Sequence, residues 1–225
     1  MPLLLACSWL AAVPASLPAA PQATDPDAPV DSDWVLRTLA RPAPMRTSFV
    51  EVRDSPLLKA ALRLSGDYQR PDDATLVREV RVPYVETTTI VSGKDGAGTA
   101  TIARAGRTPR TYPLARAPEL AGLQASFGAL LSGDRATLEQ YYRIHTDGTR
   151  LQWTMTLLPK QAPLSTKMRD IVLYGRGTEL RCIETTPVKG RSVQRTLLAS
   201  AARDAGDVAD GQTLTALCHG EAKTP

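Results

Sequence analysis

The spacing of apolar residues changes along the chain from a helical period to strict alternation. Residues 34–39 place apolar side chains behind an acidic segment, 31–33, that can cap a helix, and Pro42 ends that helix. Beyond it, apolar and polar residues alternate in short runs separated by turns, which predicts antiparallel strands. We expect these strands at 46–53, 62–68, 76–81, 85–91 and 99–104.

A second helical stretch interrupts the strands. Its leucines and one phenylalanine recur with the spacing of a single apolar stripe: Leu120, Leu123, Phe127, Leu130 and Leu131. Gly133 ends this helix, and Asp134 can cap a short second one. Alternation then returns, with the turn Asp147-Gly148 favouring a hairpin. The later strands are expected at 141–145, 151–158, 171–174, 180–185 and 192–198.

This order of elements predicts a mainly β, α+β fold. A sheet of about ten strands does not stay flat, so we expect it to curl into a half-open antiparallel β-barrel. The helices would then form a lid over the concave face. Residues 201–225 look weakly structured, apart from 214–218.

The N-terminal segment has the pattern of an export signal. An apolar run at 3–13 is followed by small residues, which predicts a signal peptide over residues 1–20 and a periplasmic location. The run is too short to span a membrane. Residues 21–30, rich in Pro, Ala and Asp, are expected to be a disordered leader. Because 4–7 also resembles a lipobox, a lipid anchor on Cys7 is an alternative.

Removal of the signal would leave two cysteines, Cys182 and Cys218. An even number in an oxidising compartment predicts a disulfide, which would pin the tail at 201–225 to a domain at 31–200. The alternative is that Cys182 is a buried strand residue and Cys218 is a free thiol.

Composition and motifs argue against most other functions. The 43% hydrophobic and 22% charged residues of this 225-residue chain are ordinary for one globular domain. The net charge of +4 is spread along the chain, so we expect no nucleic-acid partner. Neither His145 nor His219 belongs to a metal-binding spacing, and nucleotide and hydrolase motifs are absent from the sequence. We therefore predict no enzyme, cofactor or metal. A hydrolase using a serine, His145 and an acid is the remaining catalytic alternative.

The apolar faces have two interpretations. In any globular fold they pack against each other, but a stripe that covers an incompletely filled concavity would admit an acyl chain. The residues concerned are Leu62, Leu64, Trp153, Met155, Leu157 and the helix stripe with Leu123, Phe127 and Leu130.

Two motifs resemble the periplasmic outer-membrane lipoprotein carrier protein family (LolA-like). The first is the Arg70-Pro71 step within 68–78, followed by a proline and a strand that ends near Gly93. The second is Leu-Leu-Pro-Lys at 157–160. The resemblance covers about 33–200. Val77 and Glu79 stand where the family usually has aromatic residues, and the tail is unfamiliar, which indicates a divergent branch with its cargo left open.

The resemblance implies a fold and a role. Family members accept acylated cargo from an inner-membrane transporter and pass it to an outer-membrane acceptor, and we expect a monomer that does the same. Arg70 matches the arginine that holds the lid closed; the alternative is a strand-end arginine bonded to a turn carbonyl. The cargo and lid residues predicted in this way are Arg70, Leu62, Leu64, Leu123, Phe127, Leu130, Trp153, Met155 and Leu157. A non-catalytic envelope receptor or scaffold of the same fold is the alternative function.

Overall fold

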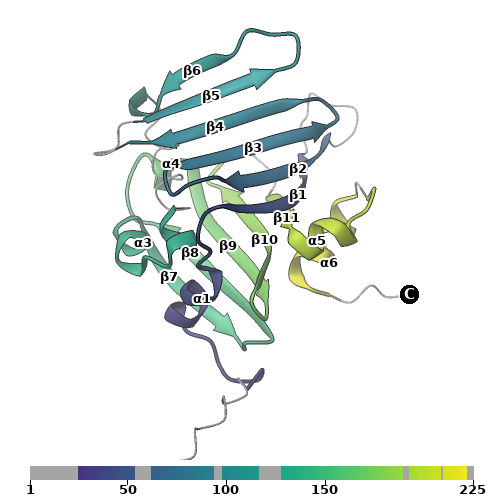
Figure 1. Cartoon of the computed structure of the whole chain (residues 1–225). Coiled ribbons are helices and arrows are strands. Elements are labelled where there is room, and N and C mark those ends of the chain that lie inside the picture. The colour runs from purple at the N-terminus through teal and green to yellow at the C-terminus, as the bar shows by residue number, and fades with distance from the viewer. Residues whose placement is uncertain are drawn as a thin grey trace, which may run out of the picture.

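The computed structural model describes residues 25–53, 62–93, 98–116, 128–189, 193–208 and 210–221. Within them, eleven antiparallel strands form one sheet in the order β6-β5-β4-β3-β2-β1-β11-β10-β9-β8-β7 (Figure 1). The edge strands β6 and β7 do not pair with each other. The sheet is therefore not closed into a barrel, in agreement with the half-open fold predicted from the number of strands.

The first six strands are β1 (Met45–Arg53), β2 (Leu62–Arg70), β3 (Thr75–Val82), β4 (Glu86–Ser92), β5 (Gly98–Arg104) and β6 (Arg110–Pro113). The last five are β7 (Tyr142–Gly148), β8 (Gln152–Pro159), β9 (Met168–Arg176), β10 (Glu179–Pro187) and β11 (Gln194–Leu198). Ten of these match the predicted strands to within a few residues. The strand β6 was not predicted, because all four of its residues are exposed at the sheet edge and no apolar face marks it.

The described helices are α1 (Ser32–Leu39), a helix at 128–132, α3 (Arg135–Tyr141), α4 (Leu164–Lys167), α5 (Ala199–Asp204) and α6 (Gly211–His219), with a 3₁₀ turn at Leu114–Arg116. Among these described helices, none has the length and apolar character needed to cross a membrane. The predicted signal peptide, its cleavage site and Cys7 lie outside the described residues. Residues 25–30 form a turn and a bridge between Pro29 and Thr149.

The two strand series are joined by pairing between β1 and β11. Phe49 lies opposite Leu198, and Val52 lies opposite Arg195. The pairing places the end of the second series beside the start of the first. One continuous concave face results, running from β4 across β1 to β8.

Helices α1 and α3 pack on the concave side of the sheet. Asp31 caps α1 by accepting a hydrogen bond from the backbone N–H of Trp34 at 2.7 Å, and Asp134 caps α3 in the same way. Arg135 of α3 bonds Asp33 of α1 at 3.0 Å, which ties the two helices together. Val35 of α1 is fully buried. The helix caps are therefore where the sequence predicted them.

Helices α5 and α6 cover the opposite face (Figure 1). Their apolar residues pack on the outward side chains of β1, β10 and β11: Ala201, Ala202, Ala205, Leu214 and Leu217 against Val50, Cys182 and Leu197. A disulfide joins Cys182 of β10 to Cys218 of α6. The tail is therefore more ordered than the sequence predicted. The pattern of hydrophobic residues did not mark α5, because this alanine-rich helix shows little apolar periodicity. Closing a loop with a sequence separation of 36 stabilises the fold by about 4 kcal/mol in the loop-entropy model.

Position 175 in β9 requires glycine, because the indole ring of Trp153 packs closely against it. A Cβ atom at Gly175 would lie 1.9 Å from Cζ2 of Trp153, which is itself buried and donates from Nε1 to the carbonyl of Gly177 at 2.9 Å. Only glycine leaves the space that the Trp153 ring fills.

We predict that Gly175→Ala lowers the free energy of unfolding by about 1–3 kcal/mol, because the added methyl group overpacks a rigid core site. The change is measured by urea unfolding followed by Trp fluorescence. Gly211→Ala is the control, since a Cβ atom there meets nothing within 4 Å. Equal stability of the two variants would show that the Trp153 ring can move aside.

Candidate functional site

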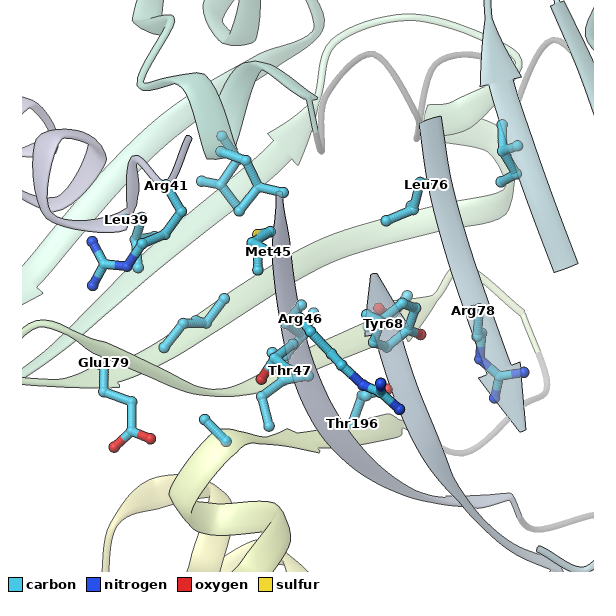
Figure 2. A pocket seen from close by; sticks show the side chains of 18 of the residues that line it. Leu39, Arg41, Met45, Arg46, Thr47, Tyr68, Leu76, Arg78, Glu179 and Thr196 are labelled. Carbon is cyan, nitrogen blue, oxygen red and sulfur yellow. The ribbon is translucent and has the colours of Figure 1, made fainter. Parts of the chain in front are cut away.

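A cavity of about 610 Å³ opens on the concave face of the sheet (Figure 2). Its walls come from α1, the helix at 128–132, and strands β1 to β4, β10 and β11. The apolar lining consists of Leu39, Met45, Leu76, Ile90, Leu130, Leu131, Leu180, Ile183, Leu198 and Ala199. The polar lining consists of Arg41, Arg46, Thr47, Tyr68, Arg78, Thr88, Thr178, Glu179, Thr185, Gln194 and Thr196.

The cavity separates two parts of the packed core. One cluster lies under α1 and includes Trp153 and Met155; the other surrounds Phe49 and Leu64. The strand β10 contributes Leu180 and Ile183, which pack against both clusters and also line the cavity. The floor of the cavity is therefore apolar and continuous with the core.

A buried charged network lies beneath the polar side of the cavity. Arg78 donates to Glu51 at 3.1 Å, and its guanidinium carbon lies 4.7 Å from the centre of the Phe49 ring. Gln194 donates to the other oxygen of Glu51 at 2.9 Å. Glu51 is only 1% exposed, so its carboxylate depends on these partners. Pairing of Arg78 with Glu51 leaves this wall polar with its charges balanced.

Arg70 lies where β2 ends, beside the cavity. Its guanidinium donates to the backbone carbonyl of Arg41 at 2.8 Å and to Asp73 at 2.6 Å. The backbone N–H of Arg41 donates in turn to the carbonyl of Leu131 at 2.9 Å, and the Arg41 side chain reaches the carbonyl of Thr178. Arg70 is thus connected through a single residue to the helix at 128–132, whose Leu130 and Leu131 line the cavity.

The predicted cargo residues occupy different places. Leu130 lines the cavity, and Arg70 borders it. Leu64, Trp153, Met155 and Leu157 are buried in the two core clusters, with Leu62 packed at the edge of one, and none of these five lines the cavity. Leu123 and Phe127 lie outside the described residues. A role of these residues in holding cargo stays a prediction.

Several cavity residues were not singled out from the sequence. Ile183 and Thr185 alternate with outward-facing Cys182 and Glu184, so the period of two places them on the inner face of β10. That signal does not distinguish a filled core position from a cavity wall. The polar residues Tyr68, Arg78 and Gln194 were not predicted to line a cavity, because they come together only through strand pairing.

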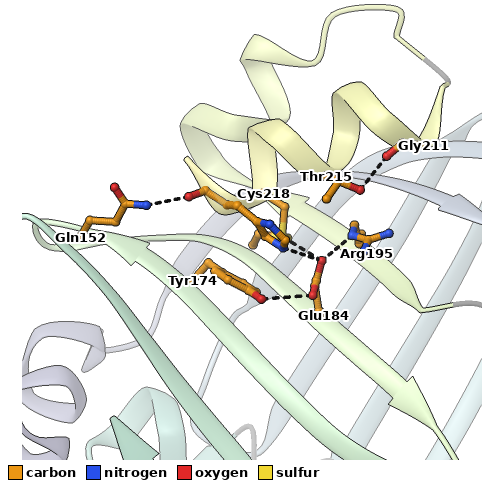
Figure 3. The surroundings of a disulfide bond; sticks show 9 residues. Gln152, Tyr174, Glu184, Arg195, Gly211, Thr215 and Cys218 are labelled. Atoms are coloured by element: carbon orange, nitrogen blue, oxygen red, sulfur yellow. Dashed lines mark hydrogen bonds and ion pairs between the residues drawn. A yellow bond between two sulfur atoms is a disulfide. The ribbon is translucent and has the colours of Figure 1, made fainter. Parts of the chain in front are cut away.

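On the opposite face, polar residues gather around the disulfide (Figure 3). Glu184 accepts hydrogen bonds from Arg195 and from the Tyr174 hydroxyl, the latter at 3.2 Å. His219 lies 3.1 Å from the same carboxylate and stacks on the Tyr174 ring. One potential metal ligand atom from each of Glu184, Cys218 and His219 lies within 4.8 Å of the others, although the Cys218 sulfur is bound in the disulfide.

Burial, and then the negative charge of Glu184, raise the pKa of Tyr174 to about 12. The neutral phenol is thus favoured in the folded protein, and in the unfolded chain the phenol ionises near 10. The contribution of Tyr174 to stability is therefore present below pH 10 and is lost as the pH rises from about 10 to about 12.

We predict that the difference in phenolate absorbance between the wild type and Tyr174→Phe has its midpoint near pH 12 in a rapid pH-jump titration. Glu184→Gln should lower this midpoint, since the burial remains and the negative charge is removed. Tyr112→Phe, which removes an exposed phenol, should leave the step near pH 12 in place. A midpoint near 10 for Tyr174 would contradict the arrangement around Glu184.

A family model described as outer membrane lipoprotein carrier protein LolA-like matches residues 23–222. The chain belongs to this family. The match extends past the region recognised from sequence motifs and includes α5 and α6, so the C-terminal helices are part of the LolA-like unit. A search of curated proteins found no match.

Proposed function

We propose that this LolA-like chain is a periplasmic carrier that holds the acyl part of lipid-modified cargo in the concave cavity. The observation that carries the proposal is a large, partly apolar cavity that the core side chains leave unfilled on the concave face. The family match supports the assignment to lipoprotein carriage. In this role the protein receives its cargo from an inner-membrane transporter and delivers it to an outer-membrane acceptor.

The size of the cavity suits acyl chains. A methylene group takes up roughly the volume of a liquid water molecule, about 30 Å³, so 610 Å³ accommodates about twenty such groups. Each buried methylene contributes about 0.8 kcal/mol. The threonines and paired charges of the cavity reduce the net binding free energy, because they lose contact with water when an acyl chain covers them. A carrier requires such moderate affinity, since it has to release its cargo.

The function requires binding without a chemical step. Cargo enters when the helix at 128–132 moves away from the sheet, and it leaves when an acceptor competes for the acyl chains. In the closed form, the hydrogen bonds from Arg70 to Arg41 and from Arg41 to Leu131 hold this helix in place. Arg70 therefore stabilises the empty cavity and opposes binding.

We predict that Ile183→Trp weakens binding of a fluorescent fatty-acid probe at least about tenfold, because the indole fills the floor of the cavity. Probe fluorescence is titrated with the full chain, and native mass spectrometry checks whether acylated species co-purify with it. Val85→Trp is the control, since Val85 is 57% exposed and lies outside the cavity lining. If the wild type binds no acyl probe, or Ile183→Trp binds it as well as the control, the carrier proposal fails.

We predict that Arg70→Leu tightens acyl-probe binding about tenfold, because the closed form loses charge-assisted hydrogen bonds to Arg41 and Asp73. Probe association and release are followed by stopped-flow fluorescence. Arg63→Leu is the matched control, since Arg63 also lies on β2 but bonds the carbonyls of Gly206 and Val208 on the opposite face. Unchanged affinity and rates in Arg70→Leu would remove the proposed role of Arg70 in closing the cavity.

A further inference from the structure

Four side chains with metal-binding atoms converge on the face opposite the cavity (Figure 3). Cys182 and Glu184 project from the same side of β10, and Cys218 and His219 end α6. The carboxylate Oε1 of Glu184 lies 3.1 Å from Nε2 of His219 and 3.7 Å from Sγ of Cys218. Sγ of Cys182 is bonded to Sγ of Cys218. Two sulfurs, one imidazole and one carboxylate therefore share a single small volume.

We propose that this cluster binds one Zn²⁺ ion when the disulfide is reduced, through Cys182, Cys218, His219 and Glu184. Zinc prefers four ligands in tetrahedral geometry, drawn from thiolate sulfur, imidazole nitrogen and carboxylate oxygen. Two thiolates favour it over cations that prefer oxygen ligands. The oxidised protein has no such site, because both sulfurs are committed to the disulfide.

Reduction and metal binding follow one after the other. A dithiol reductant breaks the S–S bond by thiol–disulfide exchange; the two cysteine sulfurs gain two electrons and two protons, and the reductant closes to its own disulfide. Zn²⁺ then displaces the two thiol protons into solvent. Disulfide and metal exclude each other, and either one links β10 to α6.

The ligands stay close together without the disulfide. Asp210 caps α6, and the buried residues Leu214 and Leu217 hold the helix against the sheet. The carbonyl of His219 accepts a hydrogen bond from Gln152 at 2.7 Å. Because the Cα atoms of the two cysteines are 5.1 Å apart, side-chain rotation alone can separate the two sulfurs for metal binding.

Neighbouring groups suit a bound cation. Tyr174 and Arg195 donate hydrogen bonds to Glu184 and orient its carboxylate, as is usual around metal ligands. Two thiolates and the carboxylate carry three negative charges, which Zn²⁺ and Arg195 together balance. A pocket of about 320 Å³, lined in part by Cys218 and His219, provides access to the cluster.

The test uses the full chain with Cys7→Ser, so that Cys182 and Cys218 are the only thiols among the three cysteines. The protein is reduced with a phosphine and titrated with Co²⁺, whose thiolate charge-transfer bands report sulfur ligation, and then with Zn²⁺ against a chromophoric chelator. We expect one ion per chain, bound at least about 100-fold more tightly than by the disulfide form.

Further variants distinguish the proposed four-ligand site from Zn²⁺ binding by two thiols alone. His219→Ala and Glu184→Gln should each weaken Zn²⁺ binding at least about tenfold. His145→Ala, which removes the only other histidine in the sequence, and Glu221→Gln, which removes a carboxylate from the pocket lining, should leave Zn²⁺ binding unchanged. His219→Cys should restore Zn²⁺ binding, because cysteine supplies another zinc ligand. This variant therefore shows whether weaker binding by His219→Ala comes from the lost ligand or from loss of folding. Equal Zn²⁺ affinity in the reduced and disulfide forms, or full affinity in His219→Ala, would overturn the proposal.

Discussion

The pairing of β1 with β11 is the contact on which the rest of the structure depends. It joins two strand series that are otherwise separate meanders, with Phe49 opposite Leu198 at the junction. Backbone hydrogen bonds across this junction make one sheet of eleven strands, which has to curl because strands twist. The concave face, the cavity and the position of α5 directly after β11 all follow from that junction.

The concave face is filled at one end and left open at the other. Under α1 and α3 the sheet presents large side chains such as Trp153 and Met155, which are fully buried. Around β1, β3 and β11 it presents polar side chains such as Thr47, Arg78 and Gln194, which line the cavity. Arg78 and Glu51 form a buried ion pair here, and separating them would leave a buried charge without its partner.

The opposite face braces the wall of the cavity. Leu198 and Ala199 line the cavity and lead directly into α5, and Glu179, also in the lining, accepts hydrogen bonds from the backbone and hydroxyl of Ser200 at 2.7 Å. Ala199 takes a positive φ of 50° at this turn, which an alanine adopts only when its surroundings hold it there. The turn from β11 into α5, bonded to Glu179 of β10, therefore ties the wall of the cavity to a helix on the opposite face.

The sequence by itself determined the local elements of this protein. Alternation places ten strands, Asp31 and Asp134 mark helix starts, and an even number of cysteines after the predicted leader points to the Cys182–Cys218 disulfide that the structure contains. The strand and helix-cap signals depend on residues that are close together in the sequence, and the disulfide prediction depends on the number of cysteines. The edge strand β6 and the alanine-rich helix α5 were not predicted, because neither has an apolar face that periodicity can detect.

Only the tertiary structure decided which inward-facing residues pack and which surround a cavity. Leu64 and Ile183 both lie on the inner face of alternating strands, yet one is fully buried in a cluster and the other lines the cavity. The difference depends on which side chains lie across the fold from each residue. The strand order and the positions of the helices determine those side chains. For the same reason the sequence showed His219 as a lone histidine in a tail. Its place beside Glu184 and the disulfide follows from the packing of α6 on β10, because contacts between distant segments leave no periodic trace in either segment.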